Sequence, residues 1–176
     1  NDAGFGGTGN DVVSAAEGAE DRVFYHRSSV YGAENHLIAL AFQREVINHT
    51  IPQVRPDLIH CNDWMTGLIP MFIRNAYKKE PVFSNSKIVY TIGQTTFKEK
   101  LEKDFLKMAT INDYITKKEL EPFKDINNIA MFNGGATYAD AITFGAEKVD
   151  KKLADQFAKV KGKKILKYDA ASDLTD

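Results

Sequence analysis

One short stretch of the chain gathers polar side chains that can hydrogen-bond a ligand or exchange a proton. They lie at the end of a mostly apolar run of strand length at residues 58–61 and precede apolar residues at helical spacing. The pattern predicts a strand, a polar turn and a helix. In open α/β sheets, ligands bind at the carboxyl ends of strands, beside helix N-termini. The candidate binding residues are His60, Asn62, Asp63, Trp64 and Thr66.

Structural roles for the same residues stay open. Asp63 can cap the turn, and Trp64, the only tryptophan, can pack beneath the loop. We expect Thr66 to cap the helix that carries residues 68–76. Pro70 then falls in the first turn of this helix, where a missing N–H costs least. A position at a strand end keeps a binding role open, because loops there often carry sites.

Strands alternate with helices along the chain. Residues 87–92 form the strongest predicted strand, and their end, Gly93 and Gln94, should lie near residues 60–64 if the two strands are neighbours. Further strands are expected at 141–144 and 163–166. Helices are expected at 34–50, where Pro52 ends the helix, at 126–139 and at 147–160. This order predicts a doubly wound, Rossmann-like α/β fold with a mostly parallel sheet flanked by helices.

Two of the expected helices are predicted to be amphipathic from the spacing of their apolar residues. The helix at 126–139 should be amphipathic, with Gly134 and Gly135 allowing close approach to the sheet. Phe97, Leu101 and Phe105 repeat at helical spacing and predict another amphipathic helix. A shorter helix is expected at 116–120.

Composition limits the classes of function. We expect one domain at 20–168, a flexible Gly-rich leader at 1–19 and an acidic tail at 169–176. A net charge of −1 and a pI of about 6.5 give no reason to expect nucleic acid. No apolar run is long enough to predict a membrane span. The single Cys61 fits a reducing, cytoplasmic setting, and the spacing of His36 and His49 predicts no metal site.

Three segments resemble one family, the bacterial glycogen synthases and plant starch synthases. RPDLIHCNDWMTGLIP, at 55–70, resembles the family signature P-D-[IVL]-[IV]-H-x-H-D-W-x-[TA]-[GA]-L-x-P. NGGATYADAIT resembles the first half of K-G-G-[IL]-x-[YF]-A-D-x-[VI]-T-T-V-S-P-x-Y. KIVYTIGQTTF stands where the family has a strand ending in T-[IV]-H-N. Together they place residues 55–149 in the family's order.

The resemblance implies the N-terminal half of a two-domain GT-B fold. In that family, glucose is transferred from ADP-glucose to the end of an α-1,4-glucan with retention at the anomeric carbon. The glucan or maltooligosaccharide lies largely against the N-terminal domain, and the donor nucleotide lies mostly on the C-terminal domain. By resemblance, the sugar-proximal residues are His60, Asn62, Asp63, Trp64, Thr66, Gly93 and Gln94.

This sequence departs from the family at several of these positions. Asn62 replaces the second His of the signature, and Gly93-Gln94 replaces the His-Asn of the next strand. An amide can hydrogen-bond a hydroxyl but cannot carry charge. Gly6 and Gly7 loosely resemble a loop that approaches the donor phosphates, although a flexible glycine-rich terminus explains them as well. We expect no counterpart of the donor-binding half in this sequence.

Two functions therefore stay open. One is a glycogen/starch synthase-like glycosyltransferase domain, completed by a second domain or a partner, with ADP-glucose as co-substrate and no cofactor. The other is a catalytically inactive glucan-binding or regulatory module descended from such a synthase. A homo-oligomer is another way to cover the apolar surface that would face a second domain. A nucleotide-binding domain of another kind has only the glycine loop in its favour.

Overall fold

The structure is a computed structural model that describes residues 35–93, 100–147, 149, 151–157, 160, 162–166 and 168. The predictions for Gly6, Gly7 and Gln94, for the leader at 1–19 and for the tail at 169–176 lie outside these residues. The proposed domain at 20–168 stays a prediction, because its start also lies outside these residues.

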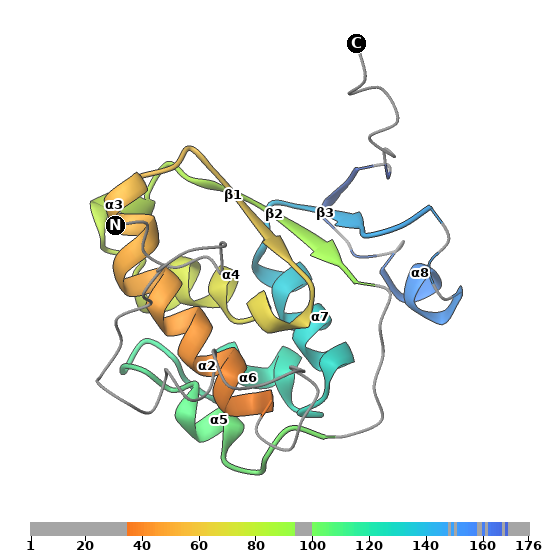
Figure 1. Ribbon diagram of the computed structural model, residues 1–176, viewed down its shortest axis with the longest axis horizontal. Coiled ribbons are helices and arrows are strands. Elements are labelled where there is room, and N and C mark those ends of the chain that lie inside the picture. The colour runs from red at the N-terminus through yellow and green to blue at the C-terminus, as the bar shows by residue number, and fades with distance from the viewer. Residues whose placement is uncertain are drawn as a thin grey trace, which may run out of the picture.

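A four-stranded parallel sheet forms the centre of the fold (Figure 1). Its strands lie in chain order: β1 (Leu58–Asn62), β2 (Lys87–Ile92), β3 (Ala141–Phe144) and β4 (Lys164–Ile165). The register pairs Asn62 of β1 with Thr91 of β2, and Thr91 with Thr143 of β3. The α/β class and the parallel sheet with flanking helices are confirmed. Because all strands run the same way, their carboxyl ends meet at one edge of the sheet.

Helices α2 (Asn35–Glu45), α4 (Ile69–Met71) and α7 (Asn128–Tyr138) gather on one side of the sheet (Figure 1). α2 continues through a π-helical turn, η1 (Val46–Thr50), into α3 (Ile51–Val54). The prediction that Pro52 ends this helix is therefore wrong. Pro52 lies where the π-helical turn passes into α3, and the chain stays helical through it. The helix ends instead at Arg55, whose backbone is left-handed (φ 51°), immediately before Pro56.

The turn after β1 also differs from expectation. A 3-10 turn, η2 (Trp64–Thr66), precedes α4, which continues as a π-helical turn, η3 (Phe72–Ala76). Thr66 does not cap α4, because its hydroxyl donates backwards to the main-chain oxygen of Asn62 at 2.8 Å. The Gln43 side chain caps α4 instead, with Oε1 accepting from Leu68 N at 2.5 Å. Pro70 lies in the first turn of α4, as predicted.

The remaining described elements are short. They are η4 (Pro81–Phe83), α5 (Phe105–Met108), α6 (Lys117–Leu120), η5 (Glu121–Phe123) and α8 (Lys151–Phe157). α6 confirms the short helix at 116–120, and Thr116 and Glu119 form a capping box at its start. α5 is only one turn long, and Leu101 lies outside it, so the described part of that prediction is too long.

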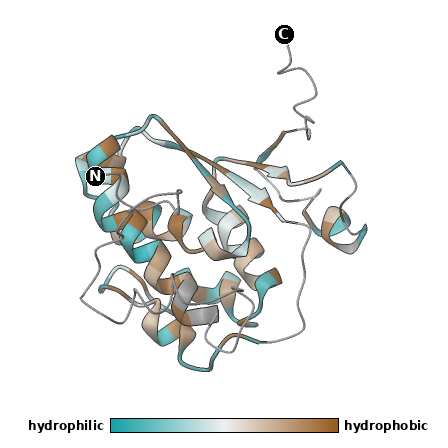
Figure 2. Cartoon of the chain, in the orientation of Figure 1, coloured by the Kyte–Doolittle hydropathy of each residue, from teal (hydrophilic) through white to brown (hydrophobic). Residues whose placement is uncertain are grey.

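The helix α7 is a core helix rather than an amphipathic surface helix, which corrects the prediction for 126–139. It contacts β2, α4, η2 and η5, and most of its residues are buried. Gly135 meets the ring of Tyr90 in β2, which confirms close approach to the sheet, whereas Gly134 meets Phe123 of η5. The helices around it carry hydrophobic and hydrophilic residues side by side (Figure 2).

Candidate functional site

The candidate site lies where β1 and β2 end. The pairing of Asn62 with Thr91 brings the next residues of both strands together. The N–H of Asp63 extends this pairing by donating to the main-chain oxygen of Thr91 at 3.0 Å. Asp63 and Gly93 therefore lie side by side at the carboxyl edge of the sheet, which is the edge where open α/β folds bind ligands.

Asp63 has a backbone conformation that side-chain-bearing residues rarely adopt. Its φ of 62° and ψ of 179° fall in a region that is almost restricted to glycine. Such a conformation costs about 1–3 kcal/mol and persists only where neighbouring contacts enforce it. Here the main-chain oxygen of Asp63 accepts from the Tyr90 hydroxyl at 2.9 Å and from the Thr66 hydroxyl at 3.0 Å. The turn is thus held from both β2 and η2.

The carboxylate of Asp63 is tied to the turn that follows it. Oδ1 accepts from the main-chain N–H of Trp64 at 2.6 Å. Burial raises the pKa of this carboxyl above its ordinary value, while the Trp64 hydrogen bond partly opposes the rise. On its other side the carboxylate rests against Gly93, where a built Cβ would lie 2.5 Å from Oδ1. A side chain at position 93 is therefore incompatible with this position of the carboxylate.

The other predicted residues surround Asp63 in different ways. Asn62 is exposed at the end of β1, and Thr66 is half-buried in η2. His60 is also exposed, and its Nε2 lies 2.6 Å from Oγ1 of Thr91 on the neighbouring strand. Trp64 is only 1% exposed, so its ring packs in the core and offers no surface to a sugar. The expectation that Trp64 lies near the sugar stays a prediction.

Both structural roles that the sequence left open are realised. Asp63 does cap the η2 turn, and Trp64 does pack beneath it. A binding role for Asp63 is compatible with capping, because among the described residues only the Trp64 N–H donates to the carboxylate. The second oxygen, Oδ2, thus keeps its capacity to accept a hydrogen bond.

Sequence reasoning missed the residues that support the site from behind. Tyr90 is fully buried and Gln43 reaches α4 from α2, so neither has a surface signature in the sequence.

Arg74 was also missed. Its Nη2 donates to Oδ2 of Asp140 at 2.6 Å and to the main-chain oxygen of Ser86 at 3.0 Å, tying the helical layer to the starts of β2 and β3. The only sequence signal for this ion pair was the Tyr-Ala-Asp segment at 138–140, which indicated Asp140 but not Arg74 as its partner.

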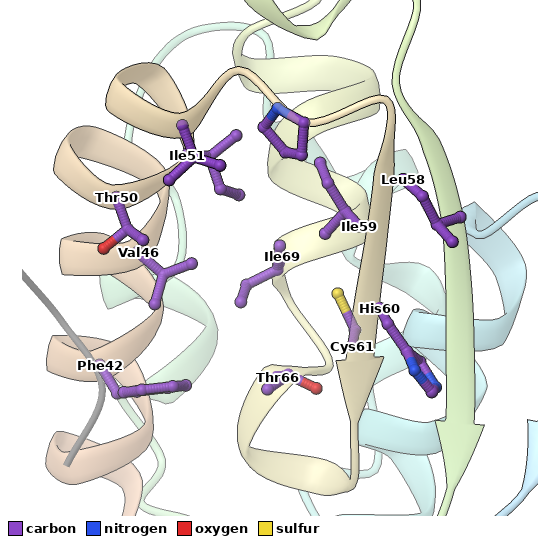
Figure 3. A pocket seen from close by; sticks show the side chains of 12 residues that line it. Phe42, Val46, Thr50, Ile51, Leu58, Ile59, His60, Cys61, Thr66 and Ile69 are labelled. Atoms are coloured by element: carbon purple, nitrogen blue, oxygen red, sulfur yellow. The ribbon is translucent and has the colours of Figure 1, made fainter. Parts of the chain in front are cut away.

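An apolar pocket of about 210 Å³ opens beside the site, between the α2–α3 helix and β1 (Figure 3). Ile59 and Cys61 point from β1 toward this pocket, whereas the ring of His60 turns toward β2. Burial raises the pKa of the Cys61 thiol to about 12. Cys61 is therefore a neutral packing residue, in agreement with its interpretation from the sequence.

Two features are absent from the described part of the chain. No cluster of three or more His, Cys, Asp or Glu side chains in the described ranges is arranged to hold a metal ion. No helix in the same part of the chain combines the length and apolarity needed to cross a bilayer.

Polar groups at the carboxyl ends of β1 and β2 lie where open α/β folds bind their ligands. Comparison with known proteins identifies the family. The sequence pattern of the starch synthase catalytic domain matches residues 12–167, which is most of the chain. The chain therefore belongs to the family of starch synthase catalytic domains.

Individual relatives are similar over part of their length. The chain is 28% identical to the glycogen synthase of Desulforudis audaxviator over 123 residues, which are 68% of this chain and 24% of that protein. It is 28% identical to the glycogen synthase of Clostridium perfringens over 138 residues, or 76% of this chain and 28% of that protein. With the glycogen synthase of Photobacterium profundum the identity is 36% over 88 residues, or 50% of this chain and 17% of that protein. The chain thus spans about a quarter of such relatives.

Proposed function

We propose that this domain holds the α-1,4-glucan acceptor for glucosyl transfer from a nucleotide sugar, ADP-glucose. The observation that carries the proposal is the convergence of Asn62, Asp63 and Gly93 at the carboxyl ends of adjacent parallel strands. Membership of the starch synthase family supports a glucan as the acceptor. In this proposal the donor nucleotide is bound by residues that lie outside the described site.

The chemistry of the site suits a neutral sugar. Pyranose rings present vicinal hydroxyls, which donate to carboxylates and exchange hydrogen bonds with amides. Asp63 supplies a carboxylate with an accepting oxygen, and the exposed Asn62 supplies both a donor and an acceptor. Neither of these two groups carries positive charge, whereas a diphosphate is held by cationic groups. The arrangement therefore fits an acceptor site better than a donor site.

Binding of maltoheptaose and incorporation of labelled glucose from ADP-glucose into glycogen test the proposal. Both are measured on the purified chain, with an intact-mass check on the same sample. We expect saturable maltoheptaose binding that Asp63→Ala weakens about tenfold, because a charge-assisted hydrogen bond is lost. Asp57→Ala is the matched control, since Asp57 is exposed just before the amino end of the same strand.

Transfer is expected only when donor-binding residues are supplied, for example by adding the part of the Clostridium perfringens enzyme that this chain does not match. Failure of the wild-type chain to bind maltoheptaose or glycogen would contradict the proposal. Equal losses in Asp63→Ala and Asp57→Ala would move the glucan site away from the ends of β1 and β2.

A further inference from the structure

Gly93 and Asp63 are in closer contact than a side chain at position 93 would permit. All three carboxylate atoms of Asp63 lie within 2.7 Å of the position that a Cβ of Gly93 would occupy. Position 93 is the one at which the family pattern has a histidine and this chain has a glycine. In this structure the Asp63 carboxylate occupies the space that the first side-chain atom of any other residue at position 93 would need.

We propose that Gly93 is a positioning residue whose missing side chain seats the Asp63 carboxylate across the ends of β1 and β2, where it accepts a hydrogen bond from a glucan hydroxyl. The inference rests on the proposed function, because it assigns the acceptor group within that glucan site.

The position of the carboxylate is fixed by more than one contact. The Trp64 N–H holds Oδ1 from the η2 side, and the Tyr90 hydroxyl holds the main-chain oxygen of Asp63 from below. Gly93 closes the remaining side. With its short side chain held on these sides, Asp63 cannot escape an added methyl group by a small rotation. Gly93→Ala must therefore displace the carboxylate or break its bond to Trp64.

Two titratable side chains are buried behind the Asp63 turn. Burial raises the pKa of both Cys61 and Tyr90, so both are neutral behind the turn at neutral pH. Oδ2 accepts no hydrogen bond from any described residue, which leaves one oxygen of a partly buried carboxylate for a ligand donor.

A double-mutant cycle with maltoheptaose tests the proposal. Asp63→Ala and Gly93→Ala are each expected to lower affinity about tenfold, and the double variant to lower it no further, because both changes remove the same interaction. The double variant should also recover the thermal stability that Gly93→Ala loses, since removing the carboxylate removes the clash. Gly145→Ala is the control: its Cβ would meet neighbours at an ordinary 3.4 Å, at the end of β3.

A spectroscopic readout separates positioning from a general loss of structure. The ¹³C signal of the Asp63 carboxyl carbon reports its titration directly, and Gly93→Ala should shift its pKa back toward the ordinary value as the carboxylate moves outward. Wild-type affinity retained in Gly93→Ala, or additive losses in the double variant, would overturn the inference and leave the proposed function intact. Absence of maltoheptaose binding by the wild-type chain would instead overturn the proposed function and, with it, the role of Asp63.

Discussion

The hydroxyl of Tyr90 donates a 2.9 Å hydrogen bond to the main-chain oxygen of Asp63, so a core residue of β2 supports the strained turn that follows β1. Tyr90 is fully buried, with its ring against Gly135 of α7. The geometry of the candidate site thus depends on a contact that no ligand can reach.

Replacing Tyr90 by Phe should weaken both the fold and the site. The change leaves the ring in place but deprives the Asp63 oxygen of its donor, which should lower the free energy of unfolding by about 1–2 kcal/mol. Because the Asp63 turn loses one of its restraints, maltoheptaose affinity should fall as well. Urea unfolding and binding titrations measure the two effects.

Tyr138→Phe is the control for this change. The Tyr138 hydroxyl donates to the main-chain oxygen of Glu119 at 2.8 Å, in a different part of the fold. The Tyr138→Phe variant should lose a similar amount of free energy of unfolding and keep its affinity for maltoheptaose. If Tyr90→Phe also kept full affinity, the hydroxyl would not support the site.

The ion pair between Arg74 and Asp140 makes a separate prediction about acid stability. Burial acts to raise the pKa of Asp140, but the Ile88 N–H and the Arg74 guanidinium outweigh it and hold the pKa below its ordinary value. The stability from this carboxylate is therefore present above the ordinary pKa of an aspartate and is lost as the pH falls through the lower pKa of the folded state.

Asp140→Ala should accordingly lower the free energy of unfolding at neutral pH by about 1–2 kcal/mol, allowing for the partial exposure of the pair. The loss should shrink in acid, where wild-type Asp140 is itself protonated. Urea unfolding over a series of pH values measures this. Glu121→Ala is the control, because the Glu121–Lys124 pair is about two-thirds exposed and its loss should leave stability nearly unchanged. A pH-independent loss in Asp140→Ala would contradict the assignment.

The strands were predictable because their signals are local. β2 and β3 have the predicted ends, and β1 is one residue longer than predicted. β2 and β3 are rich in apolar and β-branched residues of the kind that parallel sheets bury, whereas β1 alternates exposed and buried residues. Helix limits were predicted less well, because they depend on contacts distant in sequence. Gln43, from α2, caps α4 in place of Thr66, and no local pattern contains that pair.

The candidate site was predictable in its location and not in its geometry. A strand followed by polar residues indicated the edge of the sheet where Asp63 lies. The contact between Asp63 and Gly93 requires the register of two strands and a backbone angle that aspartate rarely adopts, neither of which the residue types indicate. Likewise, the burial of Trp64 depends on how η2 packs against α7, which residue type alone does not determine.

Close packing of α7 against β2 predicts an unusual response to Gly→Ala substitution. In an exposed helix this change stabilises by about 1 kcal/mol. At Gly135 the new Cβ would lie 2.4 Å from the Tyr90 ring, so we expect a loss of about 1–3 kcal/mol instead. Because Tyr90 supports Asp63, glucan affinity should fall too. Gly134→Ala, which meets Phe123 rather than Tyr90, should lose stability without this effect on binding. Thermal unfolding and maltoheptaose titration measure both, and a stabilised Gly135→Ala would contradict the packing.

The buried thiol of Cys61 predicts slow chemistry toward thiol reagents. Only the thiolate reacts, and burial raises the pKa of this thiol to about 12, so the folded protein holds almost no thiolate at pH 8. The folded chain should react with a disulfide reagent orders of magnitude more slowly than the same chain in urea. Its rate should follow local or global opening rather than reagent access. Val54 lines the same pocket as Cys61, and Val54→Ala enlarges this pocket while leaving Cys61 itself unchanged. It should leave the rate nearly unchanged if the thiol is protected by the core, whereas a large increase would mean that the pocket itself gives the reagent a path to sulfur.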